Sequence, residues 1–408
     1  MTQDLSNLTN ESSEEATEES LEELTSEGTR SGLEAEHPEP EPDQGTAPFD
    51  PSKIDVITQQ RTVDLLLTRL REGELDLSPD FQRRSNLWNE VRKSALIESI
   101  LLRIPIPSLY VSEDQFGNYT VVDGLQRMCS IAHFVNVGAL NKAVATKLNP
   151  LRLSGLQSLR EFENKSFEEL PRPLQRRIQE AELTLHVIRV GTPTNVKFNI
   201  FFRINQGGLP LNAQEIRNAL FHGEWRDRVR DLSRSSDFLH ATEGRIKGER
   251  MEDLELVLRF VSLYSLGDGQ RQADENLDEF LNNFVERRSV HWNADKWAHI
   301  TRAFERAMRA APQVFGYMVF RKYSAQGLAR RPINRGLFET ESVALARRSE
   351  ADLQVLSSRP GQVIEKFREQ FEKNRDFYNS LLYATGRGSS SNKRLEIIDK
   401  IFDEVISA

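Results

Sequence analysis

The chain has 408 residues, of which 38% are hydrophobic and 28% are charged, so it can form two or three domains with substantial cores. Its single cysteine, Cys129, excludes an internal disulfide framework and any zinc site built from several cysteines. No stretch approaches the roughly 18 apolar residues of a membrane span, and the first residues lack a signal-peptide pattern, so we expect a cytoplasmic protein without a membrane partner.

The formal net charge of −8 is distributed unevenly along the chain. Residues 1–50 contain 15 Asp and Glu and one Arg, so subtracting their −14 from −8 leaves +6 for the remainder. This stretch is rich in Glu, Ser and Thr and cannot offset its ordering entropy by burial, so we expect a disordered acidic tail over 1–50. The tail is either a plain solvated segment or a mimic of nucleic acid that masks a basic surface.

Hydrophobic periodicity predicts helices and strands from about residue 55 onwards. Val63, Leu66, Leu67 and Leu70 recur at helical spacing, and Gly73 follows as a stop. A second helix is predicted over 89–102, and prolines after it end the helix. Its expected buried face consists of Val91, Ala95, Ile97, Ile100 and Leu101.

A hairpin and further helices follow. Strands predicted over 108–112 and 119–122 are joined by a polar segment that contains Gly117. The second strand runs into Asp123-Gly124, after which apolar residues at helical spacing indicate a helix. A strand over 183–190 and a helix over 194–205 come next. Asn212 and Glu215 then form a capping-box signature for another helix.

Long helical patterns dominate beyond Gly223. They cover 251–266, 277–285, 297–311, 363–382 and 395–406, and we interpret 386–392 as a flexible connection to the last helix. The expected fold class is α+β. The acidic tail would be followed by an α/β domain over 51–222 and an all-helical domain over 223–408.

The segment Asp123-Gly124-Leu125-Gln126-Arg127 is the first candidate site. A strand, an acid, a glycine and a helix start can present backbone N–H groups to an anion, and glycine accepts the tight turn. Arg127 could reach a phosphate, Gln126 could orient water or a base edge, and Asp123 could hold a metal ion or act as a base. Alternatively, Asp123 is the helix N-cap and Arg127 is its salt-bridge partner, and the spacing alone does not decide between the two.

Two other segments carry polar residues that could line a site. Gln82 and Arg83 lie in a proline-fixed extended segment just before a helix, where surface or structural ion pairing is the alternative. The segment 201–220 places polar residues on two helices that flank a glycine pair. Its candidates are Arg203, Asn205, Glu215 and Arg217. They form either a buried polar network that locks the helix pair or the far wall of a ligand pocket.

Taken in order, these segments resemble the signature of the GmrSD restriction endonuclease N-terminal domain family over about 55–222. The first motif is Pro79-Asp80-Phe81-Gln82-Arg83 with Trp88. The second is Asp-Gly-Gln-Gln-Arg in the family and Asp123-Gly124-Leu125-Gln126-Arg127 here. The third, Phe-x-Arg-Ile-Asn-x-Gly-Gly, spans 201–208, and a trailing Glu-x-Arg-Asn-Ala spans 215–219.

The resemblance implies a ParB/sulfiredoxin-like fold, in which nucleotide phosphates bind at this strand-to-helix turn. It also implies nucleoside triphosphate hydrolysis with Mg²⁺ in DNA restriction or anti-phage defence, with DNA or a separate nuclease or modification enzyme as a further partner. Carried over, Gly124 and Arg127 would contact phosphate, and Asp123 and Gln126 would position metal or water. The nucleotide pocket would be completed by Gln82, Arg83, Arg203, Asn205, Glu215 and Arg217.

Two features depart from the family pattern. Leu125 replaces the first motif glutamine, so the protein either hydrolyses nucleotide poorly or loses nothing because this side chain points into the core. Many family members carry a His-Asn-His nuclease, whereas His291 and His299 lie beside or within a helical pattern and are interpreted as surface or core residues. Two functions therefore stay open: an NTP-hydrolysing enzyme without its own nuclease, or a non-catalytic nucleotide- or DNA-binding adaptor.

Cys129 and three basic clusters each allow two interpretations. Cys129 lies close to the turn, as the reactive cysteine of sulfiredoxin does, but its place in an apolar run favours a small core residue. The basic clusters either meet a nucleic-acid backbone or belong to an ordinary mixed-charge surface with Glu339, Glu341 and Glu350. They comprise Arg321-Lys322, Arg330-Arg331 with Arg335, and Arg347-Arg348.

Overall fold

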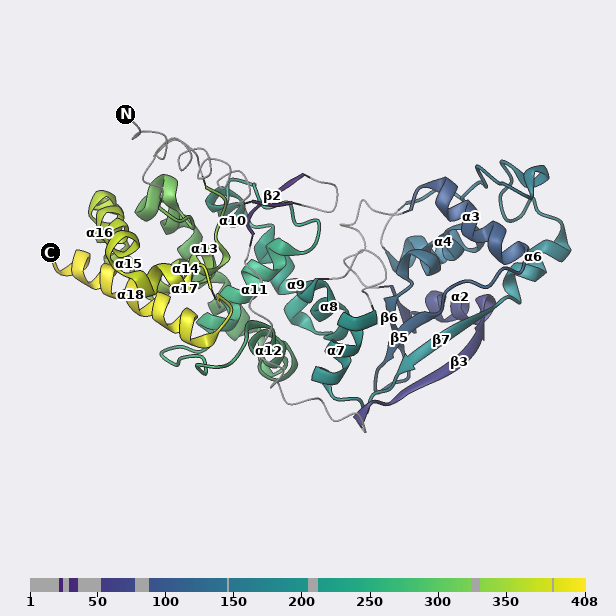
Figure 1. Cartoon of the computed structure of the whole chain (residues 1–408), viewed down its shortest axis with the longest axis horizontal. Helices are drawn as coiled ribbons and strands as arrows, with labels where there is room; N and C mark the ends of the chain where they lie inside the picture. The colour runs from purple at the N-terminus through teal and green to yellow at the C-terminus, as the bar shows by residue number, and fades with distance from the viewer. Residues whose placement is uncertain are drawn as a thin grey trace, which may run out of the picture. The chain divides into compact units, whose positions relative to one another are not determined.

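The computed structural model describes residues 22–24, 29–35, 53–77, 88–144, 147–204, 212–323, 331–383 and 385–408. The chain divides into two compact units (Figure 1). One, which we call the head unit, is Ala47–His222, and the other, the helical unit, combines Met1–Thr46 with Gly223–Ala408. No described helix is long and apolar enough to cross a membrane.

The head unit is built on a five-stranded mixed sheet with the order β3-β7-β5-β6-β4. Its strands are β3 Val56–Thr62, β4 Leu75–Asp76, β5 Leu109–Glu113, β6 Tyr119–Asp123 and β7 Glu182–Ile188. The pairs β3–β7 and β5–β6 are antiparallel, whereas β5–β7 and β4–β6 are parallel. The predicted β5–β6 hairpin and the α+β class are confirmed, and β3 and β4 were not predicted.

Helices cover both faces of this sheet. They are α2 Val63–Glu72, α3 Glu90–Leu101, α4 Leu125–Val135, α5 Val137–Ala143, α6 Arg172–Gln179, α7 Thr194–Ile204, α8 Ala213–Leu220 and the short η3 Arg160–Phe162. Neighbouring strand residues point to opposite faces. Val121 accordingly joins a main core with α2 to α6, and Val122 joins a smaller core with Phe201 of α7 and Ile216 of α8.

The first predicted helix, α2, forms as its pattern indicated. Val63, Leu66, Leu67 and Leu70 are all buried in the main core. Gly73 ends the helix in the left-handed conformation, with φ 81°, and donates its N–H to carbonyls of the last turn.

The buried face of α3 differs from the predicted one. Val91 is 52% exposed, and the helix instead buries Lys93, Ser94 and Glu98 beside its apolar residues. The Glu98 carboxylate accepts backbone N–H groups of residues 157–159 at 2.7–3.2 Å. A buried carboxylate is tolerated when it is hydrogen-bonded in this way, but periodicity cannot reveal partners 60 residues away.

The helical unit consists almost entirely of helices. They are α9 Glu224–Ser233, α10 Ser236–Ala241, α11 Glu252–Tyr264, α12 Leu277–Asn283, α13 Ala294–Phe315, α14 Arg335–Arg347, α15 Glu350–Ser358, α16 Pro360–Lys373, α17 Arg375–Ser380 and α18 Gly388–Ser407, with the short turns η5 Phe284–Arg288, η6 Ser289–His291 and η7 Gly316–Met318. The central helix α14 packs against α11, α13 and α18 and buries nearly every residue. The helix predicted over 363–382 is two helices, because Asn374 ends α16 and its side chain caps α17.

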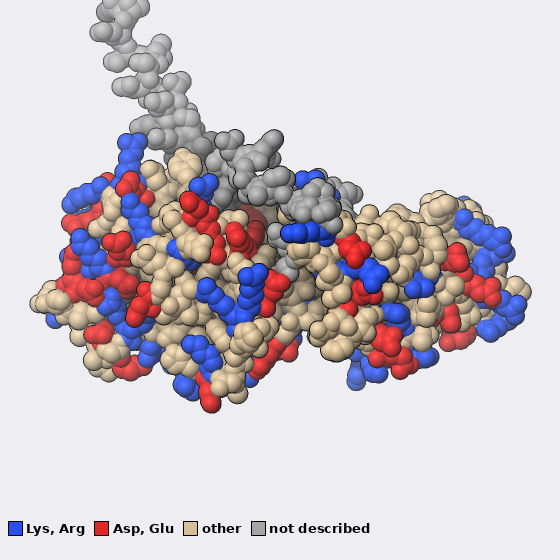
Figure 2. Space-filling model, turned by 90° about the horizontal axis from the view of Figure 1, so that it is seen from below, with Lys and Arg blue, Asp and Glu red and all other residues tan. Residues whose placement is uncertain are grey.

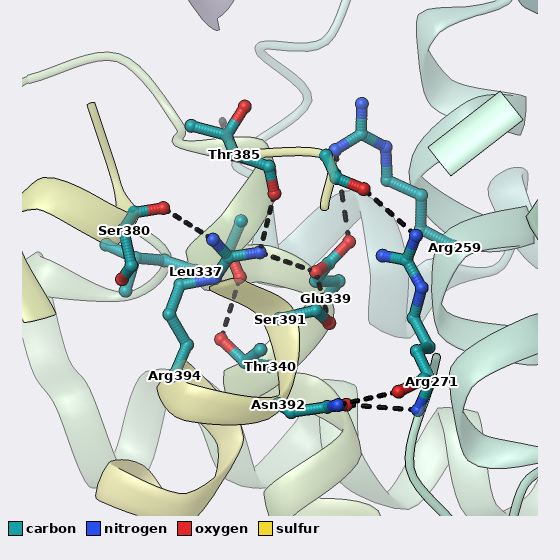
Figure 3. Close-up of polar contacts among 12 residues, drawn as sticks. Arg259, Arg271, Leu337, Glu339, Thr340, Ser380, Thr385, Ser391, Asn392 and Arg394 are labelled. Carbon is teal, nitrogen blue, oxygen red and sulfur yellow. Dashed lines mark hydrogen bonds and ion pairs between the residues drawn. The ribbon is translucent and has the colours of Figure 1, made fainter. Parts of the chain in front are cut away.

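A buried polar network joins α14 to α18 (Figure 3). Glu339 of α14 accepts from Arg394 Nη2 at 2.8 Å and from Ser391 Oγ at 2.9 Å. Arg394 also donates to the carbonyls of Ser380 and Thr385 at 2.6 and 3.0 Å. A fully buried guanidinium is thus compensated by a carboxylate and two carbonyl groups.

The predicted flexible connection over 386–392 is wrong for its last five residues, which form the first turns of α18. Gly388 lies so close to Gln272 that an added Cβ would be 1.9 Å from the Gln272 carbonyl oxygen. Asn392 exchanges two hydrogen bonds with the backbone of Arg271, at 2.8 and 3.1 Å. These tertiary contacts order a Gly- and Ser-rich sequence that reads as a loop.

The expectation of disorder throughout 1–50 is wrong for two short strands. β1 Glu22–Leu24 and β2 Arg30–Glu34 pair antiparallel, and β2 packs on the helical unit. Leu33 is fully buried, and Glu34 pairs with Lys322. The composition of the tail could not indicate this, because the partners Ile333 and Lys322 lie 288 or more residues further along the chain.

Candidate phosphate-binding turn

The turn between β6 and α4 has the strand–glycine–helix geometry expected from the sequence. Asp123 ends β6, Gly124 adopts φ 91° and ψ 12°, and α4 starts at Leu125 without any side-chain N-cap. An added Cβ at Gly124 would lie 2.1 Å from Leu109 Cδ2, so a residue with a side chain would have to displace Leu109 and also adopt a left-handed φ angle. The uncapped first turn of α4 is the positive end of the helix dipole.

Arg127 is held by three hydrogen bonds within the turn. Its Nη1 donates to the carbonyls of Pro107 and Ser108 at 2.6 and 2.9 Å, and its Nη2 donates to Asp123 Oδ2 at 2.7 Å. The Arg127 side chain is only 12% exposed, whereas that of Asp123 is 36% exposed. Of the two interpretations of this segment, the salt bridge is therefore present, but Asp123 is not the helix cap.

The first motif meets the second at Gln126. The N–H of Trp88 donates to Gln126 Oε1 at 3.2 Å, and the Trp88 ring packs against the main core. The guanidinium of Arg92 lies 4.4 Å from the centre of that ring, a cation–π contact. The two other candidates of this motif, Gln82 and Arg83, lie outside the described residues.

Residues of the third motif and its trailing segment contact β6 on the face of the sheet opposite the main core. Ile216 and Phe201 form the smaller core with Val122, the residue before Asp123. Glu215 is 5% exposed and completes the predicted capping box with Asn212, with bonds of 2.8 and 2.9 Å.

Arg217 is fully buried and donates to Gln214 Oε1 at 2.6 Å. Arg203 on α7 is exposed, and Asn205 lies outside the described residues.

The comparison with known families matches this region. Residues 64–222 fit the family model described as GmrSD restriction endonuclease, N-terminal domain. Residues 64–222 are a GmrSD N-terminal domain. The matched range contains the three motifs and every strand of the head sheet except β3. No curated protein and no solved structure matches the chain. The chain thus carries a domain of a restriction- and defence-type family.

Leu125, the departure from the family motif, is partly buried and packs against the main core of the GmrSD domain. Of the two consequences considered for this position, the structure favours the one in which the side chain is part of the core. Within this motif, Gln126 is the residue that contacts Trp88 of the first motif.

A histidine site of the GmrSD domain was not predicted. His222 Nε2 lies 2.8 Å from Asp76 Oδ2 and 3.3 Å from Thr120 Oγ1. Both contacts use the same ring nitrogen, whereas an Asp–His–hydroxyl relay needs one contact on each nitrogen. The cluster joins β4, β6 and the end of the domain, and no local signal marks it because 146 residues separate His222 from Asp76.

Cys129 is a core residue of α4. It is 1% exposed, and burial raises the pKa of its thiol to about 12, although the nearby Lys93 partly opposes this rise. A thiol that stays protonated at neutral pH is a poor nucleophile. The core interpretation of Cys129 is therefore confirmed.

The described residues contain no group of three or more His, Cys, Asp or Glu side chains that could hold a metal ion. His291 and His299 are both exposed, and His299 Nε2 lies 3.4 Å from the Tyr264 hydroxyl. The surface interpretation of these two histidines is confirmed.

The basic clusters predicted to lie at the surface are partly buried. Arg321, Lys322 and Arg335 are 2%, 5% and 7% exposed, and Glu339 and Glu341 are buried as well. For Arg321, Lys322 and Arg335 both interpretations, a nucleic-acid patch and a mixed-charge surface, are wrong, because these side chains are buried and ion-paired inside the helical unit. Arg347 and Arg348 are partly exposed and pair with Asp399, so they belong to a mixed-charge surface. Arg330 lies outside the described residues. Figure 2 shows that Lys and Arg side chains are interspersed with Asp and Glu on the face in view.

Proposed function

We propose that the GmrSD domain of this chain binds a nucleoside triphosphate at the Asp123–Arg127 turn and hydrolyses it, within a DNA restriction or anti-phage defence system. The observation that carries the proposal is the convergence of three motifs at the end of β6. Trp88 contacts Gln126 from one side, and Ile216 packs on Val122 from the other. Residues far apart in sequence thus contact the end of β6 and the uncapped helix that follows it.

The backbone of the turn would supply the phosphate contacts. The first amide groups of an α-helix lack intrahelical acceptors and carry partial positive charge, which suits a phosphate oxygen. Gly124 lets the chain adopt the left-handed φ angle of this turn, with Leu109 packed where a Cβ would lie. Arg127 would act as a positioning residue rather than a direct phosphate ligand, since its guanidinium already holds Asp123 and the entry of β5.

Hydrolysis would use Asp123 and Gln126 together with Mg²⁺. Mg²⁺ is commonly held by one or two carboxylates, substrate phosphates and water. Asp123 fits one such position, because its carboxylate is partly exposed and only one oxygen is paired with Arg127. When bound, the ion would neutralise charge on the phosphates, and Gln126 would orient water beside them.

A second function remains a candidate because of the bonds inside the turn. Gln126 Oε1 accepts from Trp88, and Arg127 makes three hydrogen bonds, so the side chains of the motif hold structure as arranged here. A module that binds nucleotide or DNA without turnover needs only the backbone amides. In both cases, we propose that any DNA cleavage is supplied by a separate protein.

The test is nucleotide binding and phosphate release with ATP, GTP, CTP and UTP, each with Mg²⁺ or EDTA. The informative variant is Gln126→Glu, which can still accept from Trp88 and is favourable in a first helical turn, but repels phosphate. We expect binding at least about tenfold weaker than wild type, equivalent to about 1.4 kcal/mol. Gln362→Glu, at an exposed position of α16, adds the same charge and should bind like wild type.

Each outcome separates the two candidates. Phosphate release by the wild type supports the enzyme, whereas binding without release supports the module. If no triphosphate binds, the proposed function fails. If Gln126→Glu binds as tightly as wild type, the nucleotide site lies elsewhere.

A further inference from the structure

The strand β2 lies in the helical unit as an extended peptide lies in a recognition groove. The N–H of Glu34 donates to the Ile333 carbonyl at 2.9 Å, and the N–H of Ile333 donates to the Gly32 carbonyl at 3.0 Å. Leu33 thereby forms a parallel bridge with Ile333. Main-chain pairing of this kind is how strand-addition sites hold a peptide.

Side chains of the helical unit recognise the residue at position 34. Glu34 Oε1 accepts from Lys322 Nζ and Glu34 Oε2 accepts from Asn334 Nδ2, both at 2.8 Å. Arg335 Nη1 donates to the Glu34 carbonyl at 3.0 Å. Both carboxylate oxygens and the backbone of one glutamate are therefore bound, which favours Glu over a neutral residue.

The two preceding positions are also selective. Leu33 is fully buried, so the groove takes an apolar side chain there. Gly32 adopts φ 85°, and an added Cβ would lie 2.3 Å from the Arg245 carbonyl oxygen. The groove thus accepts a Gly-Leu-Glu sequence and excludes a side chain at the first of these positions.

We infer that the helical unit is a recognition site for extended peptides that carry a glutamate after an apolar residue, and that the chain's own residues 30–34 occupy it in cis. The partner it fits is a protein segment with glycine, a branched apolar residue and glutamate in succession. The groove makes main-chain hydrogen bonds and requires a glycine at one position. Both features favour a peptide over a nucleic-acid backbone, which has no peptide groups and no glycine. This inference does not depend on the nucleotide site of the GmrSD domain.

Exchange with a partner strand is physically accessible. The hairpin has strands of three and five residues, and a two-stranded hairpin is marginal on its own. Its fixation to the helical unit includes the Glu34–Lys322 and Glu23–Arg335 ion pairs. A segment joined to the same chain has a high effective concentration, so it fills the groove until a tighter strand competes.

The experiment uses the full chain with Glu34→Lys, which places a like charge opposite Lys322 and so empties the groove. The probe is a fluorescein-labelled peptide with the sequence of residues 20–36, followed by anisotropy. We expect the peptide to bind Glu34→Lys at least about tenfold more tightly than wild type, whose groove is filled. Glu396→Lys, which makes the same charge change at an exposed site on α18, should behave like wild type.

Two further measurements test the specificity. A peptide carrying Gly32→Val should bind Glu34→Lys at least about tenfold more weakly, because of the overlap with Arg245. Adding Lys322→Glu to the Glu34→Lys chain should restore an ion pair in cis and abolish peptide binding. We call a chain whose groove has been emptied by substitution the opened chain. If Glu34→Lys does not melt cooperatively, Glu34→Gln, which keeps an oxygen for Asn334, serves as the opened chain instead.

Several results would overturn the inference. One is that wild type and the opened chain bind the peptide equally. Another is that an opened chain that melts cooperatively does not bind the peptide. A third is that the opened chain binds the Gly32→Val peptide as tightly as the unchanged peptide. Binding of a labelled 20-base-pair duplex by the opened chain without peptide binding would identify a nucleic-acid surface instead. A wild-type dimer that dissociates on Glu34→Lys would show exchange between copies rather than occupation in cis.

Discussion

Arg127 and Asp123 form an ion pair across one turn at the start of α4, with 2.7 Å between Nη2 and Oδ2. The other terminal nitrogen of Arg127 binds the carbonyls of Pro107 and Ser108, the two residues before β5. One guanidinium therefore ties the end of β6 to the entry of β5. The turn is preorganised by side-chain contacts before any ligand binds.

Replacing Arg127 should destabilise the head unit. We expect Arg127→Ala to lower the free energy of unfolding by about 2–3 kcal/mol, because three hydrogen bonds of a charged, mostly buried group are lost. Arg127→Lys should recover little of this loss, since a single ammonium cannot reproduce the fork. Denaturant unfolding followed by circular dichroism measures the effect. Arg176→Ala, at a side chain that is 66% exposed, should change stability by less than about 0.5 kcal/mol.

Gly124→Ala and Gly73→Ala separate backbone strain from steric overlap. Both glycines have similar left-handed φ angles, 91° and 81°, but only Gly124 has an atom within 4 Å of an added Cβ. We expect a loss of about 1 kcal/mol for Gly73→Ala and of about 3 kcal/mol for Gly124→Ala. Equal losses in urea unfolding would mean that Leu109 moves aside and that Gly124 is required only for its φ angle.

Glu341 should make stability fall as pH rises. Its side chain is fully buried, Oε2 accepts the N–H of Phe320 at 2.9 Å, and Oε1 has no hydrogen-bond partner among the described residues. Burial raises the carboxyl pKa well above 4.5, so above pH 4.5 the unfolded chain ionises first and stability is lost until the folded carboxyl ionises too.

Glu341→Gln should remove this decline. The stability of the variant relative to wild type should be greater at pH 8 than at pH 4.5, as measured by unfolding at a series of pH values. A difference that does not change with pH would show that Glu341 is ionised at neutral pH, with its charge compensated by the buried Arg321, whose own pKa burial lowers to about 10.

The network in Figure 3 makes Glu339 the compensating charge for Arg394. Glu339→Ala should cost about 3–5 kcal/mol, because it leaves a fully buried guanidinium without its carboxylate. Ser391→Ala removes only one neutral donor to the same carboxylate and should cost about 1 kcal/mol. If the two variants unfold at the same denaturant concentration, Arg394 is satisfied by the carbonyls of Ser380 and Thr385 alone.

The sequence predicted most helices of the head unit and the central hairpin, because their apolar periodicity is strong. In the helical unit it predicted α11, α12, α13 and α18 but not α9, α10, α14 or α15. It missed β3, whose residues 58–62 are all polar, and β4, which has two residues and no pattern. It also placed Arg321 and Lys322 at the surface. Charged residues are usually solvated, so a charge pattern predicts a surface position. No local feature of the sequence indicated that Lys322 would pair with Glu34, which is 288 residues away.

The candidate site was predicted as a segment but not as a set of roles. The Asp123-Gly124 turn could be predicted because a strand, a glycine and a helix start form one local unit. Arg127 could not be assigned, because its partners at 107 and 108 depend on how β5 enters the sheet. Because Arg127 is engaged with Asp123, Pro107 and Ser108, we propose that a ligand contacts the backbone of the turn rather than its arginine.

Amide hydrogen exchange tests the central claim most directly. At a saturating concentration of a triphosphate that binds, with Mg²⁺, the amides of residues 124–127 should exchange more slowly than without nucleotide, while those of α2 should not change. The phosphate would accept from these amides at the uncapped start of α4. Unchanged exchange at 124–127 together with protection in another segment would contradict a phosphate site at the Asp123 turn.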